Sequence, residues 1–593
     1  MSNITACPLD CYDACSIDYV DGKFRAVKAG HTQGFLCPHM NHYEKVQTIA
    51  KPRYGGQEIT LSEALEKLQE MLNSSQKSEV LHYRGHGNFA LMQEVTDHFF
   101  ASFGATLTDG TLCDGAGEAG ILEGRGSNKN MPLSEIVKSE VVIVWGRNPH
   151  TSSSHLLPLL KGKKVIVIDP IATKIAKNAD LYLQIKPKTD LYLALLIVRF
   201  LCINDECNDE FVEEYASELE EYYELTQTVR IKSMLENMGI SLGQVGDVIE
   251  LIKDKKVAIV CGVGIQKYRD GADTMRAIDS IAVALGLFGK EGCGVAYLGE
   301  SRANVVSPFN TQAKRVSKVN TMFEKFKTVF IQGANPLSQM PDSLRVKESI
   351  SQVQNVVYFG LYENETSEVA DLVIPAKSFL HKDDIRTSYS HNAMLNMPKV
   401  KESEFGISEY DLSARLCAMF EIEIKEEEEY LQYFKSHRLL KIDGCHYVEG
   451  REEIPYQDGF DTDDGEFVFL EEVEIDRHAN KITLTKNSHK KKKKSDELYL
   501  ITSKNSTSLN SQFGRGRYVY LHSSHGYEDG SMLKISSVTG SVELPLKLND
   551  DLREDCILIY SGTRGVNNLT SCEHSYEGKS AVYQENRVVV EKV

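Results

Sequence analysis

The sequence lacks a hydrophobic run that is long enough to cross a bilayer. The longest, LYLALLIVRFLC (residues 191–202), contains Arg199 and is far shorter than the roughly 20 apolar residues of a membrane-spanning helix. We interpret it as a buried helix and expect a protein that is not embedded in a membrane. The first residues show neither a basic segment followed by an apolar one nor a twin-arginine pair, so we see no export signal and expect a cytoplasmic protein.

Positive charge is also scarce. The chain has 67 lysines and arginines against 85 aspartates and glutamates, which gives a formal net charge of −18 at pH 7. Because binding to nucleic-acid phosphates requires a basic surface, this balance argues against a nucleic-acid partner. The hydrophobic fraction of 41% and the charged fraction of 26% are ordinary for a globular protein, and a length of 593 residues favours about four domains.

Two common nucleotide-binding motifs are missing. There is no Walker A sequence, and GVGIQKYRDG (residues 262–271) matches the pattern G-x-G-x-x-G only in part, so ordinary ATP and NAD sites are not supported. The cysteines also lack the even, short-range spacing of small disulfide-rich secreted domains. Nine of the thirteen are scattered singly, namely Cys113, Cys202, Cys207, Cys261, Cys293, Cys417, Cys445, Cys556 and Cys572.

The other four cysteines stand together near the beginning of the chain. Cys7, Cys11 and Cys15 follow the pattern C-x3-C-x3-C, and Cys37 follows after 21 intervening residues. Three ligands from one loop and a fourth from a returning segment are typical of a [4Fe–4S] cluster, whose iron prefers soft thiolates. A single zinc, which usually takes two close pairs, and four unrelated thiols are the alternatives. Residues 16–30 predict a β-hairpin that turns at Asp21 and Gly22.

Several β-branched runs end in glycine or aspartate and are followed by helical patterns, which predicts parallel sheets covered on both faces. Two of these runs end in the same signature, G-x-N-P, at Gly146–Pro149 and Gly333–Pro336. Because ligands of such sheets bind beyond the carboxyl ends of the strands, the repeat predicts two related nucleotide-binding domains. Asp169 ends the strand after the first signature and could accept hydrogen bonds from a ribose or a base. Two ordinary tight turns are the alternative.

Together these motifs resemble the molybdopterin oxidoreductases of the dimethyl sulfoxide reductase superfamily, and the resemblance covers nearly the whole chain. It rests on CPLDCYDACS with GFLCPH, on VVIVWGRNP with VIVIDP and IKPKTD, on FIQGANP with ETSEVADLVIPAKSFLHKDD, and on VNNLTSCEHSYEGKSAVYQENRVVV near the end. The resemblance implies an α/β fold with a four-domain molybdopterin oxidoreductase architecture. Its parts are a small N-terminal iron–sulfur β domain, two related Rossmann-like α/β domains and a C-terminal six-stranded β-barrel domain.

The resemblance also implies the domain boundaries. The [4Fe–4S]-binding domain takes residues 1–52, one discontinuous α/β pterin-dinucleotide domain takes 53–106 plus 325–400, and the second takes 107–324. A connecting region near the cluster takes 401–489, and the barrel domain, which also contacts the pterin dinucleotides, takes 490–593. A lysine-rich run (residues 490–494) at the start of the barrel domain is interpreted as a linker.

The cofactors implied by the resemblance are a [4Fe–4S] cluster and a molybdenum or tungsten ion held by two pyranopterin guanine dinucleotides. The implied cluster ligands are Cys7, Cys11, Cys15 and Cys37. The implied ligand of the molybdenum or tungsten is Cys113, in LCDGAGEAG, although a buried structural cysteine is the alternative. The implied cofactor-binding residues are His39, Gly146, Asn148, Pro149, Asp169, Asp190, Gly333, Asn335, Pro336, Thr366, Asp371 and Asn567.

Three candidate proton-handling residues complete the predicted site: Asp114, His155 and His391. The chain also departs from the family pattern. His39 stands where the family usually has a lysine, and Lys188 stands where it often has a glycine, which bears on the role of Asp190. Asp114 stands where formate dehydrogenases have a histidine, and this speaks against formate as the substrate.

The activity implied by the resemblance is a two-electron oxo- or hydride-type transfer on a small substrate. A one-electron relay through the cluster would lead to an electron-carrier protein, such as a ferredoxin or an iron–sulfur subunit. Oxo transfer to or from a small sulfur, nitrogen or arsenic compound is the favoured reaction. The alternatives are a non-redox enzyme similar to acetylene hydratase and an electron-transfer subunit of the same fold without molybdenum.

Overall fold

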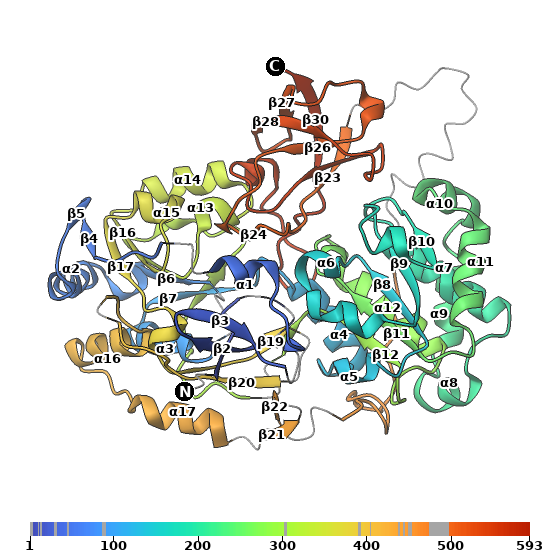
Figure 1. Ribbon diagram of the computed structural model, residues 1–593, viewed down its shortest axis with the longest axis horizontal. Helices are drawn as coiled ribbons and strands as arrows, with labels where there is room; N and C mark the ends of the chain where they lie inside the picture. Colours follow the sequence, from blue (N-terminus) through green and yellow to red (C-terminus); the bar gives the residue numbers. More distant parts are fainter. Residues whose placement is uncertain are drawn as a thin grey trace.

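The structure is a computed structural model in which two α/β bodies lie side by side, with a β-barrel above them and a small N-terminal sheet between them (Figure 1). It describes residues 4–593 apart from 10, 12, 14, 29–31, 44–46, 86–89, 302–304, 390–392, 404, 437–438, 443–444, 449–452 and 474–496. Within these residues no helix has both the length and the apolar character that a membrane crossing requires. The predicted α/β fold class is confirmed.

The first α/β body, on the right in Figure 1, contains a five-stranded parallel sheet. The strands are β8 (Val141–Trp145), β9 (Lys164–Ile168), β10 (Leu181–Leu183), β11 (Val257–Cys261) and β12 (Gly294–Ala296). Their order is β10-β9-β8-β11-β12, so the chain leaves the centre through β9 and β10 and returns to it at β11. The topological switch point, where such sheets bind ligands, therefore lies between β8 and β11.

Helices on both faces bury this sheet. The apolar run at residues 191–202 lies in α7 (Asp190–Ile203), and every residue from 190 to 198 is buried, as expected for a helix that is hydrophobic on all sides. Helix α12 (Gly271–Ala284) packs against α7 and against α4 (Gly115–Arg125). Since α4 follows Cys113 directly, this packing fixes the loop that carries Cys113.

The second α/β body has an eight-stranded sheet of order β14-β7-β6-β15-β16-β17-β4-β5. The strands are β4 (Arg53–Tyr54), β5 (Gln57–Glu58), β6 (Val80–Arg84), β7 (Thr106–Asp109), β14 (Arg315–Ser317), β15 (Thr328–Gln332), β16 (Asn355–Gly360) and β17 (Leu372–Pro375). All except the β4–β5 hairpin run parallel. The switch point lies between β6 and β15, which come from two distant stretches of the chain.

One boundary drawn from the sequence differs from this sheet. Strand β14 pairs in parallel with β7, although residues 107–324 were assigned to the other α/β domain. The end of β7 also lies beyond the boundary at residue 106. The three residues of β14, Arg-Val-Ser, have no apolar run that would mark them as a strand, and their place is set by pairing with β7.

The N-terminal sheet contains β1 (Ile4–Ala6), β2 (Ser16–Val20) and β3 (Lys23–Ala26) in antiparallel order. The hairpin predicted after Cys15 is present in β2 and β3. Its turn residues Asp21 and Gly22 both have positive φ, +52° and +76°, as a two-residue hairpin turn of type I′ requires.

The C-terminal barrel is closed by six strands, as predicted. In chain order they are β23 (Glu497–Ile501), β26 (Val519–Leu521), β27 (Met532–Ser536), β28 (Ser541–Leu548), β29 (Cys556–Ile559) and β30 (Arg587–Lys592). The barrel touches both α/β bodies. The Ala172 N–H donates to the Asp551 carbonyl at 2.8 Å, and the Asp342 N–H donates to the Thr570 carbonyl at 2.8 Å. The lysine-rich linker lies outside the described residues.

Candidate active site

The two G-x-N-P loops occupy equivalent positions, one at each switch point. Gly146 follows β8 and Gly333 follows β15, with φ of +60° and +55°. On the neighbouring strand a glycine faces each loop. A Cβ atom on Gly262 would lie 1.9 Å from the Gly146 carbonyl oxygen, and one on Gly85 would lie 2.5 Å from the Gly333 carbonyl oxygen. Only glycine allows these close backbone approaches, so both pairs hold their loops in the same way.

The asparagine and proline of each signature begin a short helix. Asn148 precedes α6 (Pro149–Ser152) and Asn335 precedes α13 (Pro336–Gln339), with proline at the first helical position, where its missing N–H costs nothing. The Asn335 side chain accepts a hydrogen bond from Thr366 Oγ1 at 2.8 Å. Asn148 Oδ1 is buried and has no hydrogen-bond partner among the described residues, so a bound ligand could use it.

A cavity of about 1130 Å³ lies between the two α/β bodies, the N-terminal sheet and the barrel. This volume exceeds that of ordinary small-molecule pockets, about 300–1,000 Å³. The predicted site residues that line it are Cys11, Cys113, Gly146, Asn148, Asp169, Asp190, Gly333, Asn335 and Asn567. The structure therefore gathers both G-x-N-P loops and Cys113 around one space.

Two buried carboxyl groups lie at the first-body side of this cavity. Burial raises the pKa of Asp169 to about 7, and its Oδ1 accepts a hydrogen bond from the Ile171 N–H at 2.8 Å. Burial raises the pKa of Asp190 to about 6, and its Oδ1 accepts from Trp145 Nε1 at 2.7 Å. Both groups line the cavity and keep acceptor capacity for a ligand.

Lys188 adopts a backbone conformation that explains why glycine often stands at its place. Its φ is +67°, in the left-handed region that favours glycine. Its ammonium forms an ion pair with Glu585 of the barrel domain. The substitution therefore preserves the turn before α7, and Asp190 still faces the cavity.

Cys113 lies in the loop between β7 and α4. Its N–H donates to Thr111 Oγ1 at 2.8 Å, and Thr111 Oγ1 donates to Asp114 Oδ1 at 3.1 Å. Asp114 is the N-cap residue of α4 and is not among the residues that line the cavity. The cavity wall here also includes Tyr83 and Lys318, which the sequence did not single out because neither belongs to a recognisable motif.

The glycines after Cys113 allow other segments of the chain to approach α4 closely. A Cβ atom on Gly115 would lie 2.5 Å from the Gly578 carbonyl oxygen, and one on Gly120 would lie 2.2 Å from the Ala272 carbonyl oxygen. They allow α4 to pack closely on α12 and on a loop of the barrel domain.

The four N-terminal cysteines lie within electrostatic reach of one another. Burial, with a further contribution from Cys37, raises the pKa of Cys7 to about 12, and burial also raises the pKa values of Cys11, Cys15 and Cys37. The Cys7 N–H donates to the Cys15 carbonyl at 2.8 Å, and Cys37 is the N-cap residue of α1 (Pro38–His42). No three of these sulfur atoms all lie within 4.8 Å of one another.

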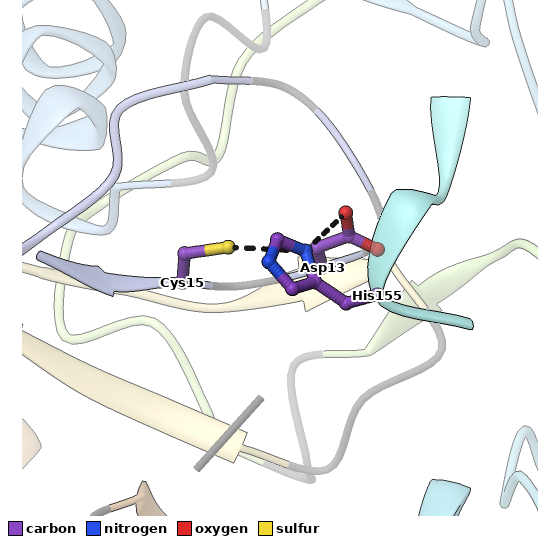
Figure 2. Close-up of side chains that lie close together, drawn as sticks. All are labelled: Asp13, Cys15 and His155. Carbon is purple, nitrogen blue, oxygen red and sulfur yellow. Dashed lines mark hydrogen bonds and ion pairs between the residues drawn. The ribbon is translucent and has the colours of Figure 1, made fainter. Parts of the chain in front are cut away.

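His155 lies beside the cysteines and does not line the large cavity. Figure 2 shows its ring between Asp13 and Cys15. Its Nδ1 is 2.8 Å from Asp13 Oδ2 and 3.6 Å from Cys15 Sγ, and its Nε2 is 2.9 Å from the Phe35 carbonyl oxygen. Burial lowers the pKa of His155, but the hydrogen bond and charge of Asp13 outweigh it and leave the pKa raised. The ring also stacks on Phe35, with centroids 4.2 Å apart.

The remaining predicted residues fall in different places. His39 Nε2 is 3.1 Å from the Ser508 carbonyl oxygen, and His39 lines a small cavity with Cys11 and Cys37. Asn567 donates to the Ser338 carbonyl at 2.7 Å, beside the second G-x-N-P loop. Asp371 accepts from the Val356 N–H near the amino end of β16, does not line the cavity, and holds two strands together. His391 lies outside the described residues.

The barrel supplies a contact that the sequence analysis missed. The Arg515 guanidinium forms an ion pair with Glu365, and Glu365 Oε2 accepts from Asn335 Nδ2 at 2.9 Å. This chain of contacts joins the barrel to the second G-x-N-P loop. Nothing near Arg515, in GRGRY, signals that role, because it depends on the folded position of the barrel.

The comparisons with known proteins agree with this architecture. A family model for molybdopterin oxidoreductase matches residues 57–409. The chain is 29% identical over 428 residues to the probable oxidoreductase YyaE of Bacillus subtilis, a match that spans 65% of this chain and 64% of YyaE. It is 23% identical over 674 residues to the probable oxidoreductase YoaE of the same organism, spanning 99% of this chain and 98% of YoaE.

A solved structure shows the same fold. Acetylene hydratase from Pelobacter acetylenicus matches with a TM-score of 0.77, covering 100% of both chains at 15% sequence identity.

Proposed function

The chain belongs to the molybdopterin oxidoreductase family, and on this premise we propose that it transfers two electrons to or from a small substrate bound beside Cys113. The electrons would pass singly through a [4Fe–4S] cluster to an electron-carrier protein. The observation that carries the proposal is the pair of equivalent G-x-N-P sites, one at each switch point, that open into one cavity of about 1130 Å³ with Cys113 in its wall.

The residues in the cavity wall fit two pterin guanine dinucleotides. Asp169, Asp190 and Asn148 would offer hydrogen-bond acceptors to one, and Asn335 would lie against the other. Cys113 would offer a soft sulfur ligand to molybdenum or tungsten. When bound, this cofactor supplies a metal that changes its oxidation state by two, and the cluster supplies a carrier of single electrons.

The spacing of the N-terminal sulfur atoms supports a cluster over a single zinc. Tetrahedral zinc with Zn–S bonds near 2.3 Å would bring its sulfur ligands to about 3.8 Å from one another. No three of the four sulfurs all lie within 4.8 Å of one another, so the set is wider than that ion requires. Burial raises the pKa values of these thiols and so disfavours their deprotonation. Binding to iron would offset this cost, because iron binds the thiolate form.

The positions of the two described proton-handling candidates separate their roles. Asp114 is held by Thr111 directly after Cys113, and we keep it as a proton-handling residue. His155 touches Cys15 and has no place in the wall of the large cavity, so we assign it to the cluster. Its Nδ1, which also contacts Asp13, would lie beside the sulfur of a cluster ligand.

Elemental and cofactor analysis tests the proposal. Protein purified without oxygen is expected to contain iron near four and molybdenum or tungsten near one per chain, and to release guanine on acid treatment. Replacing Cys113→Ala should abolish dye-linked turnover while guanine release stays unchanged, whereas Cys417→Ala, at a buried cysteine outside the cavity, should leave turnover intact. Zinc in place of iron, with no guanine, would overturn the proposal.

The non-redox alternative has one supporting observation, the fold shared with acetylene hydratase. A dye assay separates the two activities. A redox enzyme reduces or oxidises an artificial electron carrier in step with its substrate, whereas hydration of acetylene leaves the dye unchanged.

A further inference from the structure

Two buried polar side chains in the cavity wall make no hydrogen bond or ion pair with any residue that the structure describes. Lys318 is 9% exposed, and its ammonium makes no hydrogen bond or ion pair with any described residue. Tyr83 is 2% exposed, and its hydroxyl has no hydrogen-bond partner in the described part of the chain. Both residues line the same cavity as Cys113.

Their positions follow from the order of the sheet. Tyr83 lies in β6, the Cys113 loop leaves β7, and Lys318 follows β14, and these are three neighbouring strands. The Lys318 N–H donates to the Asp109 carbonyl at 2.7 Å, which fixes it at the carboxyl end of β7. With strands about 4.8 Å apart, the two unpaired donors flank the Cys113 loop at the edge where such sheets bind ligands.

Two arginines and two aspartates lie close enough to Lys318 to act on its charge. Those that act on it are Arg84, Asp97, Arg315 and Asp114. Arg84 Nη2 lies 2.9 Å from Asp97 Oδ2, so this carboxylate already has a partner.

The other two groups form hydrogen bonds with other residues. Arg315 donates to the backbone carbonyls of Thr108 and Thr311, and Asp114 accepts from Thr111. A buried ammonium without a partner is strongly unfavourable, and its presence in a cavity wall points to an anionic ligand.

We propose that Lys318 and Tyr83 bind a small oxyanion beside Cys113, and that the substrate of this oxidoreductase is therefore an oxyanion of nitrogen, sulfur or arsenic. That this ligand is the substrate rests on the proposed function. That it is an anion rests on the two unpaired donors. The ammonium gives a charge-assisted hydrogen bond and the phenol a neutral one, which together favour an anion over a neutral sulfoxide or amine oxide.

A phosphate of the bound cofactor could offer the same oxygen atoms to Lys318. We assign Lys318 to the substrate and not to the cofactor phosphate, because Lys318 and Cys113 lie in the same part of the cavity wall. Guanine release distinguishes the two sources. A lysine that holds the cofactor would, when replaced, lower the guanine content of the purified protein.

The experiment measures the affinity of the purified holoenzyme for nitrate, used as the anionic probe, and for dimethyl sulfoxide, used as the neutral one. Isothermal titration calorimetry is applied to the wild type and to Lys318→Gln, Lys318→Arg and Tyr83→Phe. Lys314→Gln removes an exposed lysine from the same segment and is the matched control.

We expect Lys318→Gln to weaken nitrate binding at least tenfold, Lys318→Arg to restore it to within about threefold, and Tyr83→Phe to have an intermediate effect. Lys314→Gln should bind nitrate like the wild type. The affinity for dimethyl sulfoxide should be the same in all four variants as in the wild type. Equal nitrate affinity in Lys318→Gln and Lys314→Gln would overturn the inference, as would a loss of guanine from Lys318→Gln.

The same measurements separate this inference from the proposed function. Nitrate binding that depends on Lys318 in protein without guanine or molybdenum would contradict the proposed function and support the anion site. Protein that contains guanine and metal, but binds nitrate independently of Lys318, would support the proposed function and contradict the anion site.

Discussion

His155 Nδ1 lies 2.8 Å from Asp13 Oδ2, and this contact joins the first α/β body to the loop that carries the N-terminal cysteines. His155 belongs to a short helix (Ser154–Leu160) that follows the first G-x-N-P signature, whereas Asp13 stands between Cys11 and Cys15. One side chain thus reaches from a predicted dinucleotide site to the predicted cluster. We therefore propose that it positions the predicted cluster.

Replacing His155→Phe is expected to lower the midpoint potential of the cluster. Phenylalanine keeps the stacking on Phe35 but removes the nitrogen near Cys15 Sγ, and a hydrogen bond to a ligand sulfur stabilises the more negative, reduced cluster. A redox titration followed by electron paramagnetic resonance measures the potential. His150→Phe, in the preceding short helix α6, is the control. An unchanged potential with reduced turnover would instead favour the proton-handling role predicted from the sequence.

The buried ion pair between Arg125 and Asp279 is expected to stabilise the packing of α4 on α12, which holds the Cys113 loop in place. Both side chains are fully buried, and Arg125 Nε lies 2.6 Å from Asp279 Oδ2. Replacing Asp279→Leu leaves the guanidinium without its partner and should destabilise the protein by about 3–5 kcal/mol. Pairing it with Arg125→Met should recover most of the loss. Thermal unfolding of the single and double variants measures this, and equal losses in both would refute the pairing argument.

Local chemistry explains what could be predicted from the sequence. The G-x-N-P loops were found because glycine, asparagine and proline act through their own backbone preferences. The glycine partners Gly85 and Gly262 were missed, since their role depends on strands that become neighbours only in the folded sheet. Residues 202 and 207 were counted as isolated cysteines, yet their sulfur atoms are 3.4 Å apart because the chain turns back after α7.

The sequence also did not indicate which of these side chains line the cavity wall. Lys318 stands in a polar stretch that resembles any exposed loop, and burial follows from the pairing of β14 with β7. His155 was predicted as a site residue from its distance to the first signature, but its direction, toward the cysteines, depends on the packing of the N-terminal sheet against the first α/β body.

Replacing Gly262→Ala is expected to disrupt the first dinucleotide site. The added Cβ atom would lie 1.9 Å from the Gly146 carbonyl oxygen, so the backbone of β8 or β11 has to shift. We expect a lower melting temperature and less guanine released per chain. Gly246→Ala is the matched control, because no described residue outside its own helix turn lies within 4 Å of the added Cβ atom and alanine favours the helix there. Equal guanine release from both variants would show that the close approach is dispensable.

Oxyanion binding should weaken as the pH rises through about 8. Burial, aided by the nearby Arg84 guanidinium, lowers the pKa of Lys318 to about 8. The lysine is therefore charged at pH 6 to 7 and loses its proton above pH 8. Because the anion binds the charged form, it raises the pKa of the lysine, so that binding above pH 8 takes up a proton. Well above the pKa, affinity should fall about tenfold per pH unit.

Calorimetry with nitrate between pH 6 and pH 10, in buffers of different ionisation enthalpy, measures both the affinity and the proton uptake. Arginine stays charged throughout this range, so Lys318→Arg should bind nitrate with little change up to pH 10 and without proton uptake. If this variant loses affinity over the same pH range as the wild type, another group controls the titration. Tyr83→Phe should keep the pH dependence of the wild type, since its phenol acts as a neutral donor and contributes no charge to the site.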